Sequence, residues 1–117
     1  MSVGGGLRRG DIVLVLFPFT DLSGTKRRPA LIVGRVESDD LVLAFITSRL
    51  PAGSPLSAHS LVPGDPEFRA TGLKVPSSVR LDKLATLHRR LVTRRLGAIG
   101  PRTTSAVGAC LRHALEL

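Results

Sequence analysis

The chain has 117 residues, 43% of them hydrophobic, which suits a single domain with one packed core. Its 17 lysines and arginines exceed its 9 aspartates and glutamates and give a net charge of +8. That excess favours an anionic partner, either nucleic acid or an acidic protein, although a merely solvated basic surface has the same composition. A single cysteine excludes a disulfide framework and a cysteine-rich zinc site.

The N-terminal residues are predicted to form a flexible leader over residues 1–8, followed by one domain to the end of the chain. Three consecutive glycines, Gly4 to Gly6, support the flexible leader. The stretch has no apolar region of the kind found in secretory signals, and no apolar run in the chain reaches the about 20 residues needed to span a bilayer. We therefore expect a cytoplasmic protein with no membrane association.

Three short apolar runs in the first half predict β-strands. They are Asp11 to Phe17, Pro29 to Val36 and Leu41 to Thr47, the last preceded by a turn at residues 38–40. Pro29 stands at the first position of its strand, where a missing N–H is tolerated. Because the runs are almost continuously apolar, we expect strands buried on both faces, or a barrel wall whose outer side is covered by a partner.

The next segment, residues 48–71, is rich in proline and glycine and is predicted to be mostly loop, with a short strand near residues 60–62. Ser78 to His88 alternates between apolar and charged residues, with Arg80 and Asp82 on the open side, which predicts a half-exposed strand. Leu91 to Ile99 is predicted to be a further strand, with a helix as the alternative.

The C-terminal segment predicts a helix that begins at Pro101, with Gly100 as its cap. An apolar stripe at helical spacing consists of Val107, Cys110, Leu111, Ala114 and Leu115. Cys110 lies in this stripe, so we expect a buried small side chain rather than a nucleophile. Several strands followed by one helix indicate a small, strongly bent β-sheet or barrel closed by a helix.

Polar residues at the ends of the predicted strands form the candidate site. Arg28 lies at a junction of loop and strand, Thr47 and Ser48 end the third strand, and Arg80 and Asp82 share one face of a later strand. If these ends converge, the set can promote attack of an RNA 2′-hydroxyl on its adjacent phosphate. The same residues also fit an exposed ion pair, an ordinary strand end and a solvated basic loop.

Metal and cofactor sites are not indicated by the sequence. His59, in the predicted loop, His88 and His113 have no metal-ligand spacing, so we expect structural roles for all three. There is no phosphate-binding Walker loop, no glycine-rich dinucleotide loop and no arrangement of a Ser–His–Asp triad. We expect neither a metal nor a cofactor.

In order and approximate spacing, these motifs resemble those of the PemK/MazF toxins, small endoribonucleases of type II toxin–antitoxin systems. The resemblance rests on Arg9 to Val13, Arg28-Pro29, Ile46 to Ser48, Ser78 to Asp82 and the closing segment Leu91 to Leu117. The loop PFTDLSGTKRRP, which ends at Pro29, is most similar to the PemK-like branch. Each motif is weak alone, but together they cover nearly the whole chain.

The resemblance implies a mainly β fold with a C-terminal helix, the SH3-like small barrel of CcdB/PemK type, and a homodimer. It implies sequence-selective, metal-independent cleavage of single-stranded RNA that leaves a cyclic phosphate and a 5′-hydroxyl. An antitoxin whose acidic tail occupies the RNA groove is the implied protein partner, and DNA is contacted only through the antitoxin complex. The high positive charge suits such a partner.

The resemblance also implies roles for individual residues. Arg28 is expected to stabilise the transition state, Thr47 and Ser48 to contact the phosphate, and Arg80 and Asp82 to act as acid and base. Lys26 and Arg27 are further candidates for phosphate binding. Phe19 is the best candidate for base contact, because the chain has only 4 Phe and no Trp or Tyr.

One departure from the family concerns its first loop. The histidine that some members carry there has no counterpart between Pro18 and Arg28, which leaves open whether the loop contributes to catalysis beyond Arg28. The alternative function is a non-catalytic barrel of the same fold, for example a gyrase-type poison or an RNA-binding module, which predicts binding without cleavage. The joint presence of Arg28, Thr47, Arg80 and Asp82 argues against that alternative.

Overall fold

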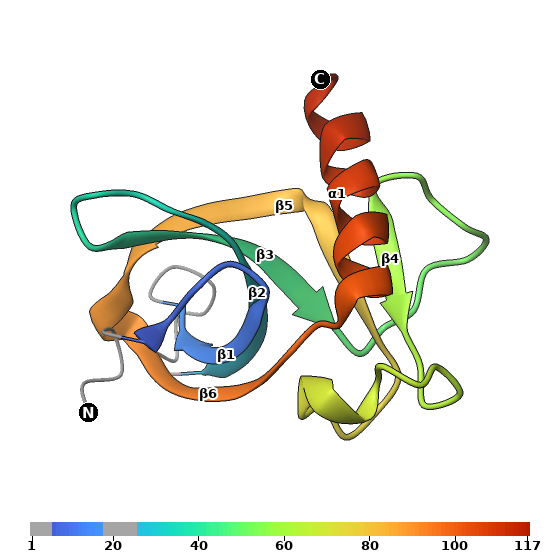
Figure 1. Cartoon of the computed structure of the whole chain (residues 1–117), viewed down its shortest axis with the longest axis horizontal. Helices are drawn as coiled ribbons and strands as arrows, with labels where there is room; N and C mark the ends of the chain where they lie inside the picture. Colours follow the sequence, from blue (N-terminus) through green and yellow to red (C-terminus); the bar gives the residue numbers. More distant parts are fainter. Residues whose placement is uncertain (1–5, 18–25) are drawn as a thin grey trace.

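The computed structural model describes residues 6–17 and 26–117. In this part of the chain, six antiparallel strands form one sheet in the order β4-β5-β3-β2-β1-β6, and a helix follows them (Figure 1). The strands are β1 (Asp11–Leu16), β2 (Arg27–Arg35), β3 (Asp40–Thr47), β4 (Ala58–Leu61), β5 (Ser77–His88) and β6 (Val92–Ala98). The helix is α1 (Pro101–Leu115), and the short 3-10 helices are η2 (Arg69–Thr71) and η3 (Arg89–Leu91). The predicted mainly β fold with a C-terminal helix is confirmed.

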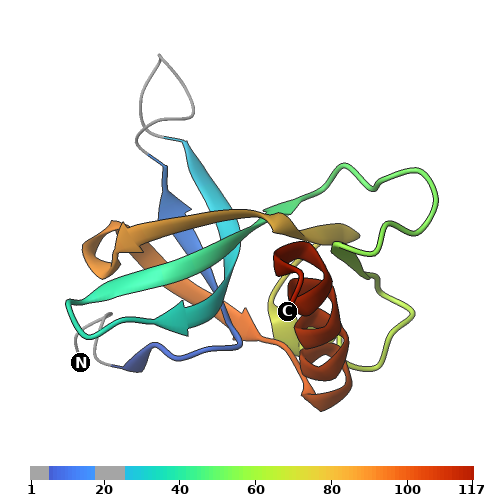
Figure 2. The same ribbon diagram turned by 90° about the horizontal axis from the view of Figure 1, so that it is seen from above.

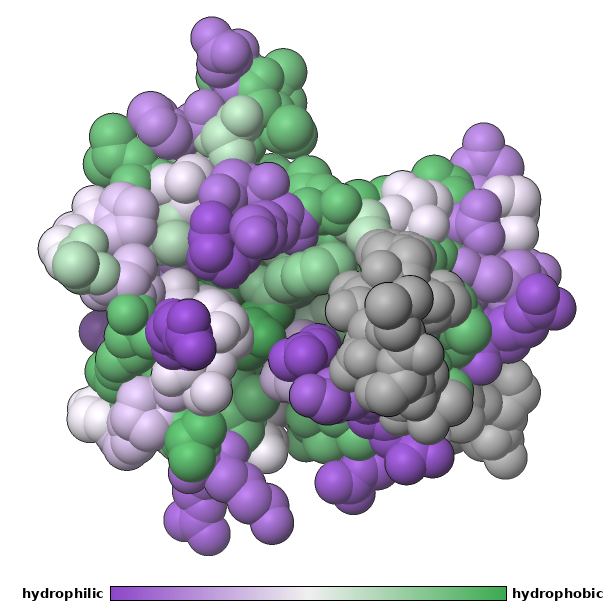
Figure 3. Space-filling model, turned by 180° about the vertical axis from the view of Figure 1, so that it is seen from behind, coloured by the Kyte–Doolittle hydropathy of each residue, from purple (hydrophilic) through white to green (hydrophobic). Residues whose placement is uncertain are grey.

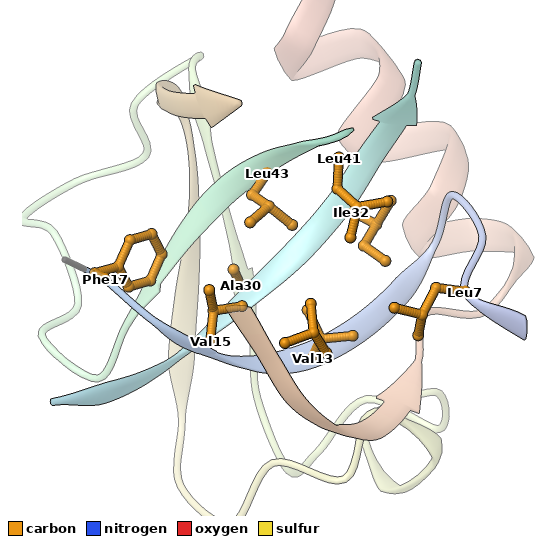
Figure 4. Packing of buried hydrophobic residues seen from close by; sticks show 9 residues of the cluster. Leu7, Val13, Val15, Phe17, Ala30, Ile32, Leu41 and Leu43 are labelled. Atoms are coloured by element: carbon orange, nitrogen blue, oxygen red, sulfur yellow. The ribbon is translucent and has the colours of Figure 1, made fainter. Parts of the chain in front are cut away.

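The sheet curls into a barrel beside which α1 packs (Figures 1 and 2). Alternating residues of β1, β2 and β3 contribute to two separate core clusters, because successive side chains of a strand point to opposite faces. The first cluster fills the barrel interior and includes Val13, Val15, Phe17, Ala30 and Leu43 (Figure 4). The second lies on the outer face and includes Ile12, Leu31, Ile46, Val79 and, from α1, Val107.

The two clusters decide between the alternatives for the apolar runs. Ile12, Val13, Leu31 and Ile32 are all nearly inaccessible to solvent, although neighbours along each strand belong to different clusters. The strands are therefore buried on both faces by the chain itself, which explains why their sequences are continuously apolar rather than alternating.

Several predicted boundaries are corrected by the structure. Strand β2 begins at Arg27, so Pro29 is its third residue rather than its first. Pro29 pairs with Leu14 of β1, whereas pairing with β3 begins only at Ala30, so β2 is still open on its β3 side at the proline. The short strand of the predicted loop starts earlier than expected and places His59 on β4.

The second half of the sheet follows its prediction more closely. Residues 92–98 form strand β6, preceded by η3, so the helix alternative for this region is wrong. The predicted strand from Ser78 to His88 is confirmed and starts one residue earlier, at Ser77. Its alternation is interrupted, however, because Ala44 pairs with Leu84 while Phe45 pairs with Arg80. Residues 81–83 therefore form a bulge opposite β3, and the amide of Leu81 instead donates to the carbonyl of Ser57 (2.9 Å).

Helix α1 begins where the sequence predicts, with Gly100 as N-cap and Pro101 as the first residue. Val107 is buried and Cys110 is half-buried, its thiol 3.6 Å from the carbonyl oxygen of Ala58. Leu115, which the predicted stripe included, is 49% exposed because the last turn of α1 extends beyond the sheet (Figure 1). In the described residues, no helix is long and apolar enough to cross a membrane.

Candidate active site

The candidate site starts from the pairing of three strands. Residues directly opposite each other in antiparallel strands project from the same face of the sheet. Phe45 of β3 pairs with Ala30 of β2 and with Arg80 of β5, so Arg80 shares the face of the barrel interior. Two residues further along β3, Thr47 pairs with Ser78, which places both residues on that same face.

Arg28 belongs to this face as well. It pairs with Val15 of β1, a member of the interior cluster. If the register of β2 and β3 is continued two residues beyond Ala30 and Phe45, Arg28 aligns with Thr47. Because neighbouring strands are about 4.8 Å apart, the three residues converge at one end of the barrel. We call Arg28, Thr47, Arg80 and Asp82 the mouth cluster.

Asp82 joins the mouth cluster through Arg80. Nε of Arg80 donates to Oδ1 of Asp82 (2.9 Å) and Nη2 donates to Oδ2 (2.7 Å), so the ion pair is bidentate. The two side chains remain 35% and 38% exposed. Asp82 lies within the bulge of β5, and bulges commonly redirect side chains beside functional sites.

The ion pair also sets the protonation of its members. The hydrogen bond from Arg80 is the main cause that lowers the pKa of Asp82, and Lys83 adds to it. The same hydrogen bond raises the pKa of Arg80. In the ligand-free pair, Asp82 is therefore a weaker base and Arg80 a weaker acid than either group alone. A phosphate that draws Arg80 away removes the main cause that lowers the pKa of Asp82.

Thr47 has a hydroxyl group that is held in a defined position. Its Oγ1 accepts a hydrogen bond from the backbone N–H of Arg49 (3.0 Å), which leaves the hydroxyl proton available for another acceptor. Thr47 is half-buried at the end of β3, and Ser48 follows it on the exposed bend. A fixed hydroxyl donor beside two guanidiniums suits an anionic oxygen.

The other predicted site residues are placed differently. Arg27 precedes Arg28 on β2 and so projects from the opposite face of the sheet, away from the mouth cluster. Lys26 is exposed just before β2. Phe19 lies outside the described residues.

The sequence reasoning missed two residues of this face, Phe45 and Ser78. The ring of Phe45 is half-buried, and its centroid lies 4.5 Å from that of Phe17. Ser78 is fully buried, and its hydroxyl finds no hydrogen-bond partner in the described part of the chain. The signal for both is position, since Phe45 precedes Thr47 by two residues and Ser78 precedes Arg80 by two.

The histidines lie apart from one another in the fold. His59 is on β4, and burial lowers its pKa despite the opposing charge of Asp65. Nδ1 of His88 accepts a hydrogen bond from the N–H of Arg90 at the start of η3 (3.0 Å), and His113 is in the last turn of α1. Within residues 6–17 and 26–117, no group of three or more His, Cys, Asp or Glu side chains could hold a metal ion.

Comparison with known protein families gives one match along nearly the whole chain. The family model described as "PemK-like, MazF-like toxin of type II toxin-antitoxin system" matches residues 8–115. No curated protein sequence matches the chain.

Solved structures with a similar fold come from several bacteria. A mycobacterial endoribonuclease in complex with its cognate antitoxin has a TM-score of 0.72 at 23% identity, covering 96% of this chain and 97% of the other. The Mycobacterium tuberculosis toxin MazF-mt6 has a TM-score of 0.71 at 20% identity, with 92% and 97% covered. A MazE–MazF structure from Deinococcus radiodurans has a TM-score of 0.69 at 21% identity, with 95% and 97% covered. At these identities, the likeness shows a common fold.

Proposed function

The chain belongs to the PemK-like, MazF-like toxins of type II toxin–antitoxin systems, and we propose that it is a sequence-selective endoribonuclease that cleaves single-stranded RNA. The observation that carries this proposal is the mouth cluster. Strands β2, β3 and β5 bring Arg28, Thr47 and Arg80 to one face at the end of the barrel, and Asp82 is hydrogen-bonded to Arg80.

The proposed reaction uses a nucleophile that the substrate itself supplies. The 2′-hydroxyl oxygen attacks the adjacent phosphorus, and the bond from phosphorus to the 5′-oxygen breaks. The products are a cyclic phosphate and a 5′-hydroxyl. Since DNA lacks the 2′-hydroxyl, this chemistry restricts cleavage to RNA. It needs a base, an acid and donors for the charge that develops on the phosphate oxygens, and no metal.

Within the mouth cluster, we assign these roles as follows. Arg28 and the hydroxyl of Thr47 donate hydrogen bonds to the non-bridging oxygens, with Ser48 as a further donor on the exposed bend. Asp82 takes the proton of the 2′-hydroxyl. Arg80 transfers a proton to the departing 5′-oxygen, whose basicity rises as its bond to phosphorus breaks, and this gives the 5′-hydroxyl.

The ion pair provides a way to activate Asp82 only when substrate is present. While Arg80 donates both hydrogen bonds to Asp82, the pKa of the carboxyl group is held low. A phosphate competes for the guanidinium, and the exposure of both side chains gives it access. Asp82 then regains basicity beside the 2′-hydroxyl.

We further propose that an antitoxin with an acidic tail binds the same basic surface. The net charge of +8 favours an acidic partner and speeds its encounter with the toxin. The antitoxin is the proposed link to DNA, and the proposed place of action is the cytoplasm. We expect a synthetic acidic peptide to bind the protein in competition with RNA. The affinity of the peptide should fall as the salt concentration rises.

A homodimer is the proposed assembly. A groove of about 940 Å³ lies between the segment before β1, strands β2 and β6, and α1. Ala98 and Ile99, which are half-buried, are among its lining residues and can make apolar contact with a second copy. It is also lined by the exposed Arg8, Arg9, Arg94 and Arg95. Figure 3, which views the molecule from behind, shows hydrophobic and hydrophilic side chains interspersed on that face. Light scattering on the purified chain measures the assembly directly, and a monomer at micromolar concentration would contradict this part of the proposal.

The test of the function is to incubate purified protein with a long RNA in EDTA and to map the cleaved ends by sequencing. Wild-type protein is expected to cut at a recurring sequence, and Arg28→Ala and Asp82→Ala to cut far less. Absent wild-type activity, or equal activity in both variants, would overturn the proposal. RNA binding without any cleavage would instead indicate the non-catalytic barrel.

A further inference from the structure

Ser78 is the feature of this site that the proposed reaction leaves unexplained. Its hydroxyl is buried and has no hydrogen-bond partner in the described part of the chain. A buried hydroxyl without a partner costs free energy, and native proteins contain few of them. Ser77, its neighbour, is also buried, yet its Oγ donates to the carbonyl of Val75 (2.9 Å). The missing partner is thus particular to Ser78 and not to this stretch of β5.

Two residues lie directly opposite Ser78, Thr47 of β3 and the exposed Ser60 of β4. Thr47 is the one that belongs to the mouth cluster; its side chain and that of Ser78 project from the same face, and Arg80 lies two residues further along β5 on that face. Ser77 and Val79 belong to the opposite face, and Val79 packs in the outer core cluster. Cross-strand pairs of Thr and Ser form hydrogen bonds readily in sheets.

The hydroxyl oxygen of Thr47 can accept one more hydrogen bond. A hydroxyl oxygen can accept two hydrogen bonds and donate one. Oγ1 of Thr47 already accepts from the N–H of Arg49, which leaves one acceptor position and the proton. If the proton goes to a phosphate oxygen, the remaining lone pair of Oγ1 is directed to another donor.

We propose that Ser78 is a positioning residue for RNA: when Thr47 donates to the phosphate, Ser78 donates to Oγ1 of Thr47. Both hydroxyls are then satisfied, and the donor from Ser78 polarises the O–H bond of Thr47 and strengthens its bond to the phosphate. In the free protein the hydroxyl of Ser78 has no hydrogen-bond partner among the described residues, and in the RNA-bound protein it gains one. The inference rests on the proposed RNA cleavage, because it specifies how one phosphate-binding group is oriented.

The test combines stability with kinetics. Ser78→Ala removes the unpartnered hydroxyl, so the melting temperature is expected to rise while kcat for RNA cleavage falls about tenfold. The matched control is Ser77→Ala, which loses a satisfied hydrogen bond on the other face. That variant is expected to melt lower and to keep its kcat. A kcat of Ser78→Ala equal to that of the wild type would overturn the inference.

A double-mutant cycle shows whether Ser78 acts through Thr47. In the Thr47→Ala background, Ser78→Ala is expected to change kcat less than about twofold. An equal tenfold loss in both backgrounds would overturn the inference.

Binding of a mixed-sequence 2′-O-methyl RNA, which cannot be cleaved by this chemistry, separates the inference from the proposed function. If wild-type protein binds this RNA but cleaves no ribose RNA, the proposed function fails alone. Weaker binding by Ser78→Ala then still supports its role, and unchanged binding overturns it. If wild-type protein neither cleaves nor binds RNA, both fail.

Discussion

Asp82 at the barrel mouth and Glu67, which contacts the first turn of α1, are both carboxylates that accept more than one hydrogen bond. Their hydrogen bonds serve different purposes. Asp82 pairs with a residue two positions away, and its side chain is 38% exposed. Glu67 accepts from the N–H and Oγ1 of Thr103 (2.9 and 2.8 Å) and from the N–H of Arg102 (3.0 Å). Its side chain is only 16% exposed.

The hydrogen bonds of Glu67 maintain the fold, whereas those of Asp82 can be exchanged during the reaction. Glu67 joins the segment between β4 and β5 to a helix that begins more than thirty residues later, and it satisfies backbone N–H groups that the helix leaves unpaired. An exposed ion pair between near neighbours contributes little to folding. Asp82 can therefore exchange its partner without cost to the structure.

The largest expected effect is that of Asp82→Asn on cleavage. The amide keeps the shape of the carboxylate but cannot accept the 2′-hydroxyl proton, so kcat is expected to fall about 10²- to 10⁴-fold. The free energy of unfolding, measured in urea, is expected to change by less than about 1 kcal/mol. A large loss of stability would mean that Asp82, like Glu67, maintains the fold.

Next in size is the contrast between two adjacent arginines. Arg28→Ala is expected to lower kcat/KM about 10²- to 10³-fold, because it removes a donor to the charged transition state. Arg27→Ala removes the same charge from the other face of β2 and is expected to cost less than about tenfold, through loss of general attraction to RNA. Equal losses in both variants would show that charge, rather than the face of the strand, decides activity.

A smaller effect, on stability alone, is expected for Glu67→Gln. The amide presents one oxygen where the carboxylate presents two, so the capping of α1 weakens and the melting temperature falls. Activity per folded molecule should stay at the wild-type level. Glu37→Gln, at an exposed turn, is the matched control and should melt as the wild type does.

The smallest effect is the pH dependence of that capping. Hydrogen bonds from Thr103 are the main cause that lowers the pKa of Glu67 below its ordinary value of 4.5. The stabilisation is thus complete above pH 4.5 and is lost as pH falls through the lower pKa of the folded state. The gap in melting temperature between wild type and Glu67→Gln should narrow on acidification. A gap that widens would show that the charge of Glu67 is not what stabilises α1.

Local signals explain what the sequence could predict. The apolar runs identify the buried strands, and Gly100 followed by Pro101 fixes the start of α1. Arg28, Thr47, Arg80 and Asp82 could be proposed as a site from their residue types and order, but the roles assigned to them come from the resemblance to the PemK/MazF toxins. Whether these residues lie on one face depends on the register between neighbouring strands. The sequence shows only the alternation along each strand and not that register.

Features that depend on distant partners could not be predicted. The bulge at residues 81–83 exists because β3 and β5 change register between Ala44 and Phe45, and neither sequence marks the change. The capping of α1 by Glu67 likewise depends on how the loop before β5 folds back onto the helix. The spacing from Arg80 places Ser78 rather than Ser77 on the face of the mouth cluster, but both serines are buried, and the lack of a hydrogen-bond partner at Ser78 within the described chain is seen only in the folded sheet.

The most direct test of the central claim uses one RNA oligonucleotide in two forms. Once the cleaved sequence has been mapped, the nucleotide on the 5′ side of the cut is supplied with either a ribose or a 2′-deoxyribose. The wild-type protein is expected, in EDTA, to cut only the ribose form and to leave a cyclic phosphate. Cleavage of both forms at similar rates would contradict attack by the 2′-hydroxyl and the roles assigned to the mouth cluster.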